Sequence, residues 1–291
     1  ELVIKNNDIV LSRQPVILEK GANHLEATFR IKNPRLWWCN GMGEQNMYDF
    51  SAQIVAENKV IASQNDRIGL RTIRLEQEKD QWGRSFRFIL NGVPVYAKGV
   101  NVIPFDNILS DVTPETYRRN LEPAAQANMN MLRVWGGGIY ETDEFYRQCD
   151  SLGLMIWQDF IFSCTMYPSE GQLLETMREE FADNIRRIRN QPSLALWCGS
   201  NELEYSWASK KLRTMNTQEN MDKIWQMYLD QNKAIQEALD TLCPEICYQP
   251  SSPFRGYGKN KSPYEGDYHS WSVLSGSKPI TYFEEGFSRF Y

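Results

Sequence analysis

Two glutamates in the sequence each follow a run of mostly apolar residues. Glu202 comes after the run 194–198 and directly after Asn201, and Glu284 comes after the stretch 279–283. Such runs predict buried strands, which places both carboxyl groups at strand ends. Glycoside hydrolysis needs one carboxylic acid to protonate the leaving oxygen and one carboxylate to meet the oxocarbenium-like carbon. We therefore predict that Glu202 and Glu284 are the catalytic pair.

The residue after Glu284 is a second candidate, because Glu285 is also acidic. The residue types alone leave the choice between these two neighbours open. Side chains alternate along an extended strand end, so if one of the two faces the active site, the other faces away from it. We expect Glu285 to be the residue without a catalytic role.

Other polar and aromatic residues also stand where predicted strands end. An aromatic ring beside hydrogen-bonding groups suits a sugar, which has an apolar C–H face and a polar rim. For any single Trp, a place in the core is the more ordinary role. Arg133 ends an apolar strand, where an unpaired cation would be costly, so it should face a carboxylate, either in a structural salt bridge or in the nucleophile. The predicted substrate-binding residues are Asn201, Arg133, Trp135, Asp159, His269 and Trp271.

The cysteines and glycines do not form a metal or phosphate motif. The six cysteines include no Cys-x-x-Cys pair, and the sequence has two histidines, His24 and His269. We therefore predict no metal and no cofactor. The run Gly136-Gly137-Gly138 lacks the spacing of a phosphate-binding loop, and it is predicted to be a tight loop that lets another group approach the backbone.

Length and charge exclude some classes of protein. The 291 residues are enough for two domains, and 32 Lys and Arg against 37 Asp and Glu give a net charge of −5. No basic stripe is present, so a nucleic-acid partner is not expected. No stretch approaches the roughly 20 apolar residues that a membrane span requires. A bacterial periplasmic or extracellular location is favoured over a lysosomal one.

The first 78 residues are predicted to form a sandwich of short strands. Apolar and polar residues alternate at 25–31 and at 50–54, turn residues separate such runs, and no helical period appears. Further along, Asn91-Gly92 lies between two apolar runs, which is the strongest short signal of a β-hairpin.

From residue 95 onward, predicted strands and helices alternate. Thr113 should cap the first helix, Gly153 should end the second, and Ser169 with Gln172 should form a capping box at the third. Strands are expected around 97–101, 129–135, 154–157, 193–198, 246–249, 268–269 and 280–283. This alternation predicts parallel pairing, and the strand count favours a barrel over an open sheet.

The predicted fold class is therefore a β-sandwich at 1–78 followed by an α/β unit at 79–291, an incomplete (β/α)8 barrel that lacks its eighth strand. The open edges of such a barrel carry unpaired backbone groups. We expect another copy of the chain to cover these edges in a homo-oligomer. We also expect the chain alone to bind and hydrolyse sugars weakly.

Several stretches of the sequence are similar to one enzyme family. They cover most of the chain, and the two that begin at Arg133 and Trp157 are fairly specific. The stretches are Pro34–Trp38, Gly43–Gln45, Ile68–Ile73, Lys98–Asn101, Arg133–Glu141, Trp157–Phe160, Trp197–Glu202 and Gly266–Trp271. On these residues the chain resembles the β-mannosidase branch of glycoside hydrolase family two.

The resemblance implies an immunoglobulin-like sandwich before the barrel and a retaining double displacement on an oligosaccharide or glycoside. By that pattern Glu202 is the acid/base after the fourth strand, and Glu284 is the nucleophile after the seventh. Asn201 would contact the sugar 2-hydroxyl, and Arg133 would lie under the nucleophile.

Two alternatives remain open at this point. One is another family-two specificity, such as β-galactosidase, β-glucuronidase or exo-β-glucosaminidase, and the other is a non-catalytic carbohydrate-binding fragment. Ser200 and Val102 stand where the family usually has Asn and Trp, and Glu285 replaces a common aromatic. These departures concern the fine specificity more than the class of reaction.

Overall fold

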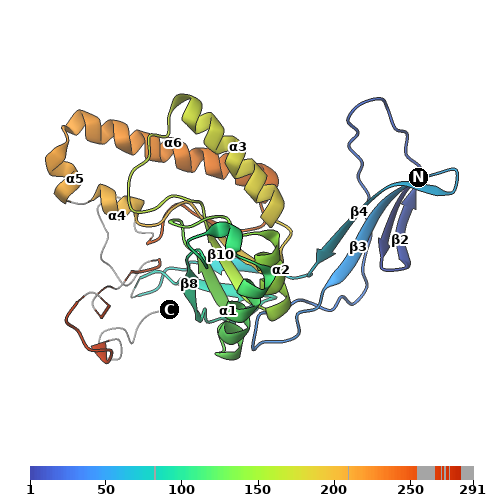
Figure 1. Ribbon diagram of the computed structural model, residues 1–291, viewed down its shortest axis with the longest axis horizontal. Coiled ribbons are helices and arrows are strands. Elements are labelled where there is room, and N and C mark those ends of the chain that lie inside the picture. Colours follow the sequence, from blue (N-terminus) through green and yellow to red (C-terminus); the bar gives the residue numbers. More distant parts are fainter. Residues whose placement is uncertain are drawn as a thin grey trace.

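The computed structural model describes residues 1–81, 83–208, 210–253, 266–269, 271, 273–274 and 276–282. An N-terminal antiparallel sheet projects to one side of a larger body, in which helices flank a parallel sheet (Figure 1). The body carries the residues that were predicted to do chemistry.

The N-terminal sheet confirms the predicted β-structure of this part of the chain. Its strands are antiparallel, in the order β2-β1-β3-β4. Their bounds are Leu2–Asn6 for β1, Ile9–Gln14 for β2, Tyr48–Ala56 for β3 and Lys59–Ile68 for β4.

The strand predicted at 25–31 is wrong. These residues belong to no strand, although Leu25 and Ala27 are half-buried between exposed neighbours. The ring of Phe29 lies 5.5 Å from the ring of Phe50 on β3. The alternation therefore marks the side chains that face the protein, whereas a strand also needs a backbone partner, which the periodicity does not specify.

A second, three-stranded antiparallel sheet leads into the body. It comprises β5 (Ile73–Glu76), β6 (Arg87–Leu90) and β7 (Val93–Val95). The predicted hairpin is confirmed: Asn91 and Gly92 join β6 to β7 with φ values of 50° and 82°. Because β5 pairs with β6, this sheet spans both sides of the predicted boundary at residues 78 and 79, and that boundary stays a prediction.

The described residues of the body form part of a (β/α)8 barrel. Five strands pair in parallel in the order β12-β11-β10-β9-β8, so strands consecutive along the chain are neighbours, as in a barrel wall. Their bounds are Gly99–Val102 for β8, Met131–Val134 for β9, Met155–Asp159 for β10, Leu194–Cys198 for β11 and Tyr248–Gln249 for β12.

Helices connect these strands and flank the sheet (Figure 1). Every residue of β10 and β11 is buried, which matches the apolar character of β11 and of the first three residues of β10. The helices are η1 (Leu109–Asp111), α1 (Pro114–Gln126), α2 (Asp143–Leu152), α3 (Gly171–Ile188), α4 (Leu203–Trp207), α5 (Lys210–Met215) and α6 (Gln218–Leu242). Among the described residues, none of these helices has the length and apolar character to cross a membrane.

Two of the three predicted helix signals are confirmed. Thr113 caps α1 through its side chain, and Gly153 ends α2 in the left-handed conformation. The capping box at Ser169 is wrong, because Glu170 occupies the cap position of α3 without a side-chain hydrogen bond. The Ser169 hydroxyl is instead buried and contacts the side-chain oxygen of Gln231 on α6 at 2.9 Å.

The last two predicted strands are not found. Residues 268–269 lie outside any strand, residues 280–281 form a turn, and Phe283 lies outside the described residues. The Tyr282 amide donates to the Pro279 carbonyl at 2.9 Å, which closes that turn. Short apolar runs beside Pro and Gly are compatible with either a strand or a turn.

A loop from the N-terminal part docks onto the barrel. The Trp37 side chain is fully buried, and its indole N–H donates to the Asp150 carbonyl at 2.8 Å. The Asn40 side chain donates to the carbonyls of Ala125 and Met129, both at 2.8 Å. The loop therefore stabilises the ends of α1 and α2, which support strands β9 and β10.

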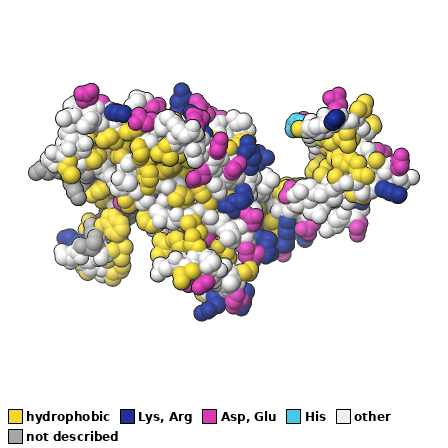
Figure 2. Space-filling model, turned by 45° about the horizontal axis from the view of Figure 1, so that its top comes forward, with side chains coloured by type: hydrophobic (Ala, Val, Ile, Leu, Met, Phe, Trp, Pro, Cys, Tyr) yellow, Lys and Arg dark blue, Asp and Glu magenta, His cyan; other side chains and the backbone are white. Residues whose placement is uncertain are grey.

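Basic and acidic side chains lie together where the N-terminal sheet meets the barrel (Figure 2). A groove of about 300 Å³ there is lined by Arg67, Arg147, Arg186 and Arg187. Each of these arginines lies within salt-bridge distance of a nearby Asp or Glu. The positive charges of the groove are therefore compensated by acidic side chains of the protein, and the groove gives no support to a polyanion partner.

We expect Gly153→Ala to destabilise the contact between this loop and the barrel. Gly153 has φ +72°, and an added Cβ would lie 2.5 Å from the Asn40 backbone nitrogen. The predicted loss is about 3 kcal/mol of unfolding free energy, measured by urea titration. Gly92→Ala is the control, because Gly92 has φ +82° with no atom within 4 Å of the added Cβ. That substitution should cost only about 1–2 kcal/mol, and equal losses for the two variants would contradict the docking contact.

Candidate active site

A cavity of about 580 Å³ opens at the carboxyl ends of the parallel strands. Functional residues of such barrels lie at this end. Glu202 and all the predicted substrate-binding residues except Asp159 line the cavity. The lining residues are Asn101, Ile103, Arg133, Trp135, Trp157, Cys164, Asn201, Glu202, Ser252, Asp267, Tyr268, His269, Trp271 and Leu274.

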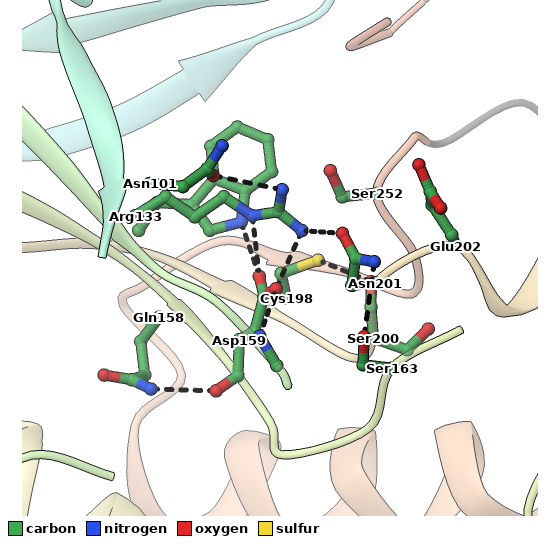
Figure 3. A network of polar contacts seen from close by, with 12 residues as sticks. Asn101, Arg133, Gln158, Asp159, Ser163, Cys198, Ser200, Asn201, Glu202 and Ser252 are labelled. Carbon is green, nitrogen blue, oxygen red and sulfur yellow. Dashed lines mark hydrogen bonds and ion pairs between the residues drawn. The ribbon is translucent and has the colours of Figure 1, made fainter. Parts of the chain in front are cut away.

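An ion pair between Arg133 and Asp159 underlies the cavity (Figure 3). Arg133 donates from Nη2 to Oδ2 at 2.7 Å and from Nε to Oδ1 at 3.2 Å. The indole N–H of Trp157 and the backbone N–H of Gly136 also donate to this carboxylate, at 3.0 and 2.9 Å. Asp159 is 0% exposed, and its oxygens are occupied by these donors. The structure therefore places Asp159 beneath the cavity and gives Arg133 a structural salt bridge.

Burial and charge act against each other in this pair. Burial raises the pKa of Asp159, and the adjacent charge of Arg133 opposes the rise. Burial would lower the pKa of Arg133, but Asp159 together with Cys198 and Asp267 outweighs burial, so that pKa is raised. Arg133 therefore keeps its positive charge directly below the cavity.

The ion pair also orients Asn201. Nη2 of Arg133 uses its second hydrogen to donate to Asn201 Oδ1, at an N···O distance of 2.9 Å. With its oxygen occupied, Asn201 turns its Nδ2 toward Ser163 Oγ and Cys164 Sγ, both at 3.4 Å (Figure 3). The Asn201 backbone N–H donates to the Phe162 carbonyl at 2.9 Å. Asn201 is thus fixed at the end of β11 with an amide N–H near the cavity.

The backbone of Glu202 is held in an uncommon conformation. Glu202 has φ 57° and ψ 21°, in the left-handed region, at the start of α4. Its N–H donates to the Ser252 carbonyl at 2.7 Å, and its carbonyl accepts from the Ser206 N–H at 2.9 Å. For a non-glycine residue this conformation costs about 1–3 kcal/mol, and such costs concentrate at functional sites.

The Glu202 carboxyl group lies on the cavity wall. Oε1 contacts His269 Nδ1 at 2.8 Å and accepts from the Trp271 indole N–H at 3.3 Å. Oε2 lies 4.0 Å from the Cys164 thiol. The hydrogen bond with His269 lowers the pKa of Glu202, and Trp271 and Arg133 add to this effect against the opposing effect of burial. Two of the predicted sugar-binding residues thus contact the predicted acid/base directly.

The glycine run 136–138 leaves room for the side chain of Trp135, another predicted substrate-binding residue. A Cβ on Gly137 would lie 2.0 Å from the ring of Trp135, and one on Gly136 would lie 2.5 Å from the Phe162 carbonyl oxygen. The prediction of a tight loop that lets another group approach the backbone is therefore confirmed. The approaching group at Gly137 is the Trp135 indole, which lines the cavity.

Among the cavity residues that were not predicted as site candidates, three contact predicted ones through their side chains near Glu202. Ser252 and Asp267 hydrogen-bond to each other, and Ser252 also contacts His269 Nε2 at 2.9 Å. Cys164 lies beside Asn201 and Glu202. Asp267 stands two residues before His269, but Ser252 and Cys164 reach the site through loops that no periodicity predicts.

The position of the predicted nucleophile, Glu284, is not described by the structure. Glu284 and its neighbour Glu285 lie outside the described residues. Their roles stay predictions. If Glu202 and Glu284 are the catalytic pair of a retaining enzyme, their carboxyl groups should lie roughly 5 Å apart.

We expect Asp159→Asn to leave the charge of Arg133 without its partner. Breaking one side of a buried ion pair should cost about 3–5 kcal/mol of unfolding free energy. Glu115→Gln is the control, because the Arg118–Glu115 pair is more than half exposed on both sides. That change should cost less than about 1 kcal/mol. Chemical denaturation of both variants checks this, and a loss at Asp159 as small as that at Glu115 would contradict a structural role for the ion pair.

Known proteins resemble this chain in sequence and in structure. The model of glycosyl hydrolases family 2 matches residues 3–71. The β-mannosidase B of Emericella nidulans is 36% identical over 263 residues, which are 88% of this chain and 31% of that protein. The β-mannosidase B of Aspergillus fumigatus is 38% identical over 260 residues, 87% of this chain and 30% of that protein. The chain thus spans about a third of the length of these curated relatives.

The solved structures agree with the sequence comparisons. By the family model and these relatives the chain is similar to glycosyl hydrolase family 2, and its antiparallel sheets followed by a parallel sheet with helices fit the immunoglobulin-like sandwich and (β/α)8 barrel of such proteins. The chain is similar to the β-D-mannosidase of Dictyoglomus thermophilum, with a TM-score of 0.86, 36% identity, and coverage of 98% of this chain and 34% of that one. The fold alone is shared with β-glucuronidase 2 of Bacteroides uniformis, at a TM-score of 0.68 and 18% identity, over 85% of this chain and 28% of that one.

Proposed function

We propose that the protein is a retaining β-glycosidase that hydrolyses terminal β-mannosides. The observation that carries this proposal is the placement of Glu202 on the cavity wall beside Asn201, which Arg133 orients from below. A carboxyl group next to a fixed amide suits a sugar whose glycosidic oxygen must be protonated while a ring hydroxyl is held.

In the proposed reaction Glu284 attacks the anomeric carbon while Glu202 protonates the departing oxygen. Glu284 then forms an ester with the sugar, and Glu202 becomes a carboxylate. In the second step Glu202 takes a proton from water, whose oxygen attacks the same carbon and releases Glu284. Asn201 is proposed to hold the 2-hydroxyl, and Trp135, His269 and Trp271 to wall the sugar site.

The choice of mannoside over other sugars rests on the relatives named above, which are called β-mannosidases. Another family-two specificity would show as faster hydrolysis of an aryl β-galactoside, β-glucoside or β-glucuronide than of the aryl β-mannoside. A non-catalytic carbohydrate-binding role would show as binding without turnover.

The roles of the two glutamates are tested by Glu202→Ala and Glu284→Ala. Glu202→Ala should lose about 10²–10⁴-fold activity on poor leaving groups but much less on good ones, since protonation is then dispensable. Azide should restore its turnover and give a β-glycosyl azide, because azide needs no general base to attack the glycosyl-enzyme. Glu284→Ala should lose activity on good and poor leaving groups alike, and azide should not give a β-glycosyl azide with it.

Glu285→Gln is the matched control for this experiment and should retain most of the activity. Azide rescue of Glu284→Ala with retained configuration would exchange the two assigned roles. A loss in Glu285→Gln as deep as that in Glu284→Gln would give the nucleophile role to Glu285.

We also propose that the edge of β8 pairs with a second copy of the chain. Among the described residues β8 pairs only with β9, and Val100 on β8 is 49% exposed. An open strand edge with an apolar side chain favours edge-to-edge pairing. Light scattering should give a dimer, and Val100→Lys should shift it to monomer. A monomeric wild-type protein at tens of micromolar would contradict the proposal.

A further inference from the structure

A chain of hydrogen bonds runs from strand β12 to the Glu202 carboxyl group. The Gln249 side chain donates to Asp267 Oδ1 at 2.8 Å, and the Ser252 hydroxyl donates to Asp267 Oδ2. Ser252 Oγ in turn lies 2.9 Å from His269 Nε2, and His269 Nδ1 lies 2.8 Å from Glu202 Oε1. Both Asp267 oxygens therefore accept hydrogen bonds, as expected of an ionised carboxylate.

The number of available protons fixes the direction of these contacts. A serine hydroxyl has one hydrogen, and Ser252 uses it on Asp267, so Ser252 Oγ can only accept from His269. Nε2 of His269 must then carry a hydrogen. A neutral imidazole has only one N–H, so Nδ1 would be bare and would face a carboxylate oxygen at 2.8 Å. The contact between Nδ1 and Oε1 is satisfied only when one further proton lies between them.

We propose that Glu202 and His269 share one proton in the resting site, and that Ser252 and Asp267 hold His269 in the orientation that keeps this proton on the side of Glu202. The pair is either an imidazolium with a carboxylate or a neutral imidazole with a carboxylic acid. These forms differ only in the position of the shared proton, and both satisfy every contact of the chain of hydrogen bonds.

The surroundings of the pair are consistent with a shared proton. Trp271 donates a second hydrogen bond to Oε1, and the charge of Arg133 also acts on Glu202. On the other oxygen the neighbour is the Cys164 thiol at 4.0 Å, which is a weak donor. Asp267 Oδ2 lies 3.9 Å from His269 Nε2, so a negative charge stands behind the imidazole. The lowered pKa of Glu202 is in accord with a proton that spends much of its time on His269.

The consequence for catalysis rests on the proposed function, in which Glu202 is the acid/base. In the first step the shared proton leaves the pair, and an O–H bond forms on the departing alcohol while the bond from the anomeric carbon to that oxygen breaks. The pair gains one negative charge as the nucleophile loses one on forming its ester, so charge is conserved. Water returns the proton in the second step. His269 is thus a positioning and proton-sharing residue.

The direct test is the tautomer of His269, read by nitrogen-15 NMR of histidine-labelled protein. The sequence has only two histidines, and exposed His24 serves as the internal reference. We expect Nε2 of His269 to stay protonated between about pH 5 and pH 8, so that Nδ1 is the nitrogen whose signal changes. In Ser252→Ala the fixed acceptor is lost, and Nδ1–H should become the main neutral tautomer. A neutral His269 with Nδ1–H and a bare Nε2 in the wild-type protein would overturn the proposal.

An enzymatic measurement completes the test. His269→Asn keeps a donor toward Glu202 but cannot carry the extra proton, so it should lose about 10–100-fold in kcat on poor leaving groups and much less on good ones, with a changed pH profile of kcat. An unchanged pH profile and leaving-group dependence would overturn the proton-sharing role. The NMR result does not depend on turnover. A protein that shows the Nε2–H tautomer but hydrolyses no β-glycoside would refute the proposed function and leave the shared proton standing.

Discussion

The buried ion pair between Arg133 and Asp159 is the interaction on which the rest of the site depends. Neighbouring strands β9 and β10 supply the two residues, so their parallel pairing sets the distance between the charges. Asp159 also accepts from Trp157 and from Gly136, which fixes the start of the glycine loop. Arg133 then orients Asn201, whose neighbour is Glu202. Because Asp159, Arg133 and Asn201 occupy one another's polar groups, their side chains are held in fixed orientations.

Two sets of contacts outside the ion pair stabilise the site, one behind strands β9 and β10 and one at the backbone of Glu202. From below, the docked loop with Trp37 and Asn40 stabilises the helix ends behind β9 and β10. At the cavity, the Ser252 carbonyl accepts from the Glu202 N–H and the Ser206 N–H donates to the Glu202 carbonyl, and these two bonds hold Glu202 in its left-handed conformation. The energetic cost of this strained residue is therefore offset by contacts with the loop at Ser252 and with helix α4. Ser252 also contacts His269, which in turn contacts the Glu202 carboxyl group, so the backbone and the side chain of Glu202 depend on one network.

The sequence predicted the parts of this structure that follow from local rules. The apolar runs of β10 and β11, the Thr113 cap, the Asn91-Gly92 turn and the placement of Glu202 at a strand end are examples. It did not predict that Asp159 lies under the cavity, or that Ser252 reaches His269, because the first depends on which way a strand-end side chain points and the second on the path of a loop, and periodicity specifies neither. The strand at 25–31 failed because alternation does not supply a pairing partner. The expected preference for a bacterial over a lysosomal location assumed that the sequence has no Asn-x-Ser/Thr glycosylation sequon. This was wrong, because Asn260-Lys261-Ser262 is one.

The central claim is that this cavity carries out a double displacement on β-mannosides with Glu284 as the nucleophile. It is tested most directly by incubating the protein with a 2-deoxy-2-fluoro-β-mannosyl fluoride and analysing its peptides by mass spectrometry. Fluorine at C2 disfavours the oxocarbenium-like transition state, so a covalent intermediate should accumulate. The account predicts one fluoromannosyl group on the peptide that contains Glu284, attached to that residue. An adduct on Glu202 or Glu285, or steady hydrolysis of the β-mannoside without any adduct, would contradict it.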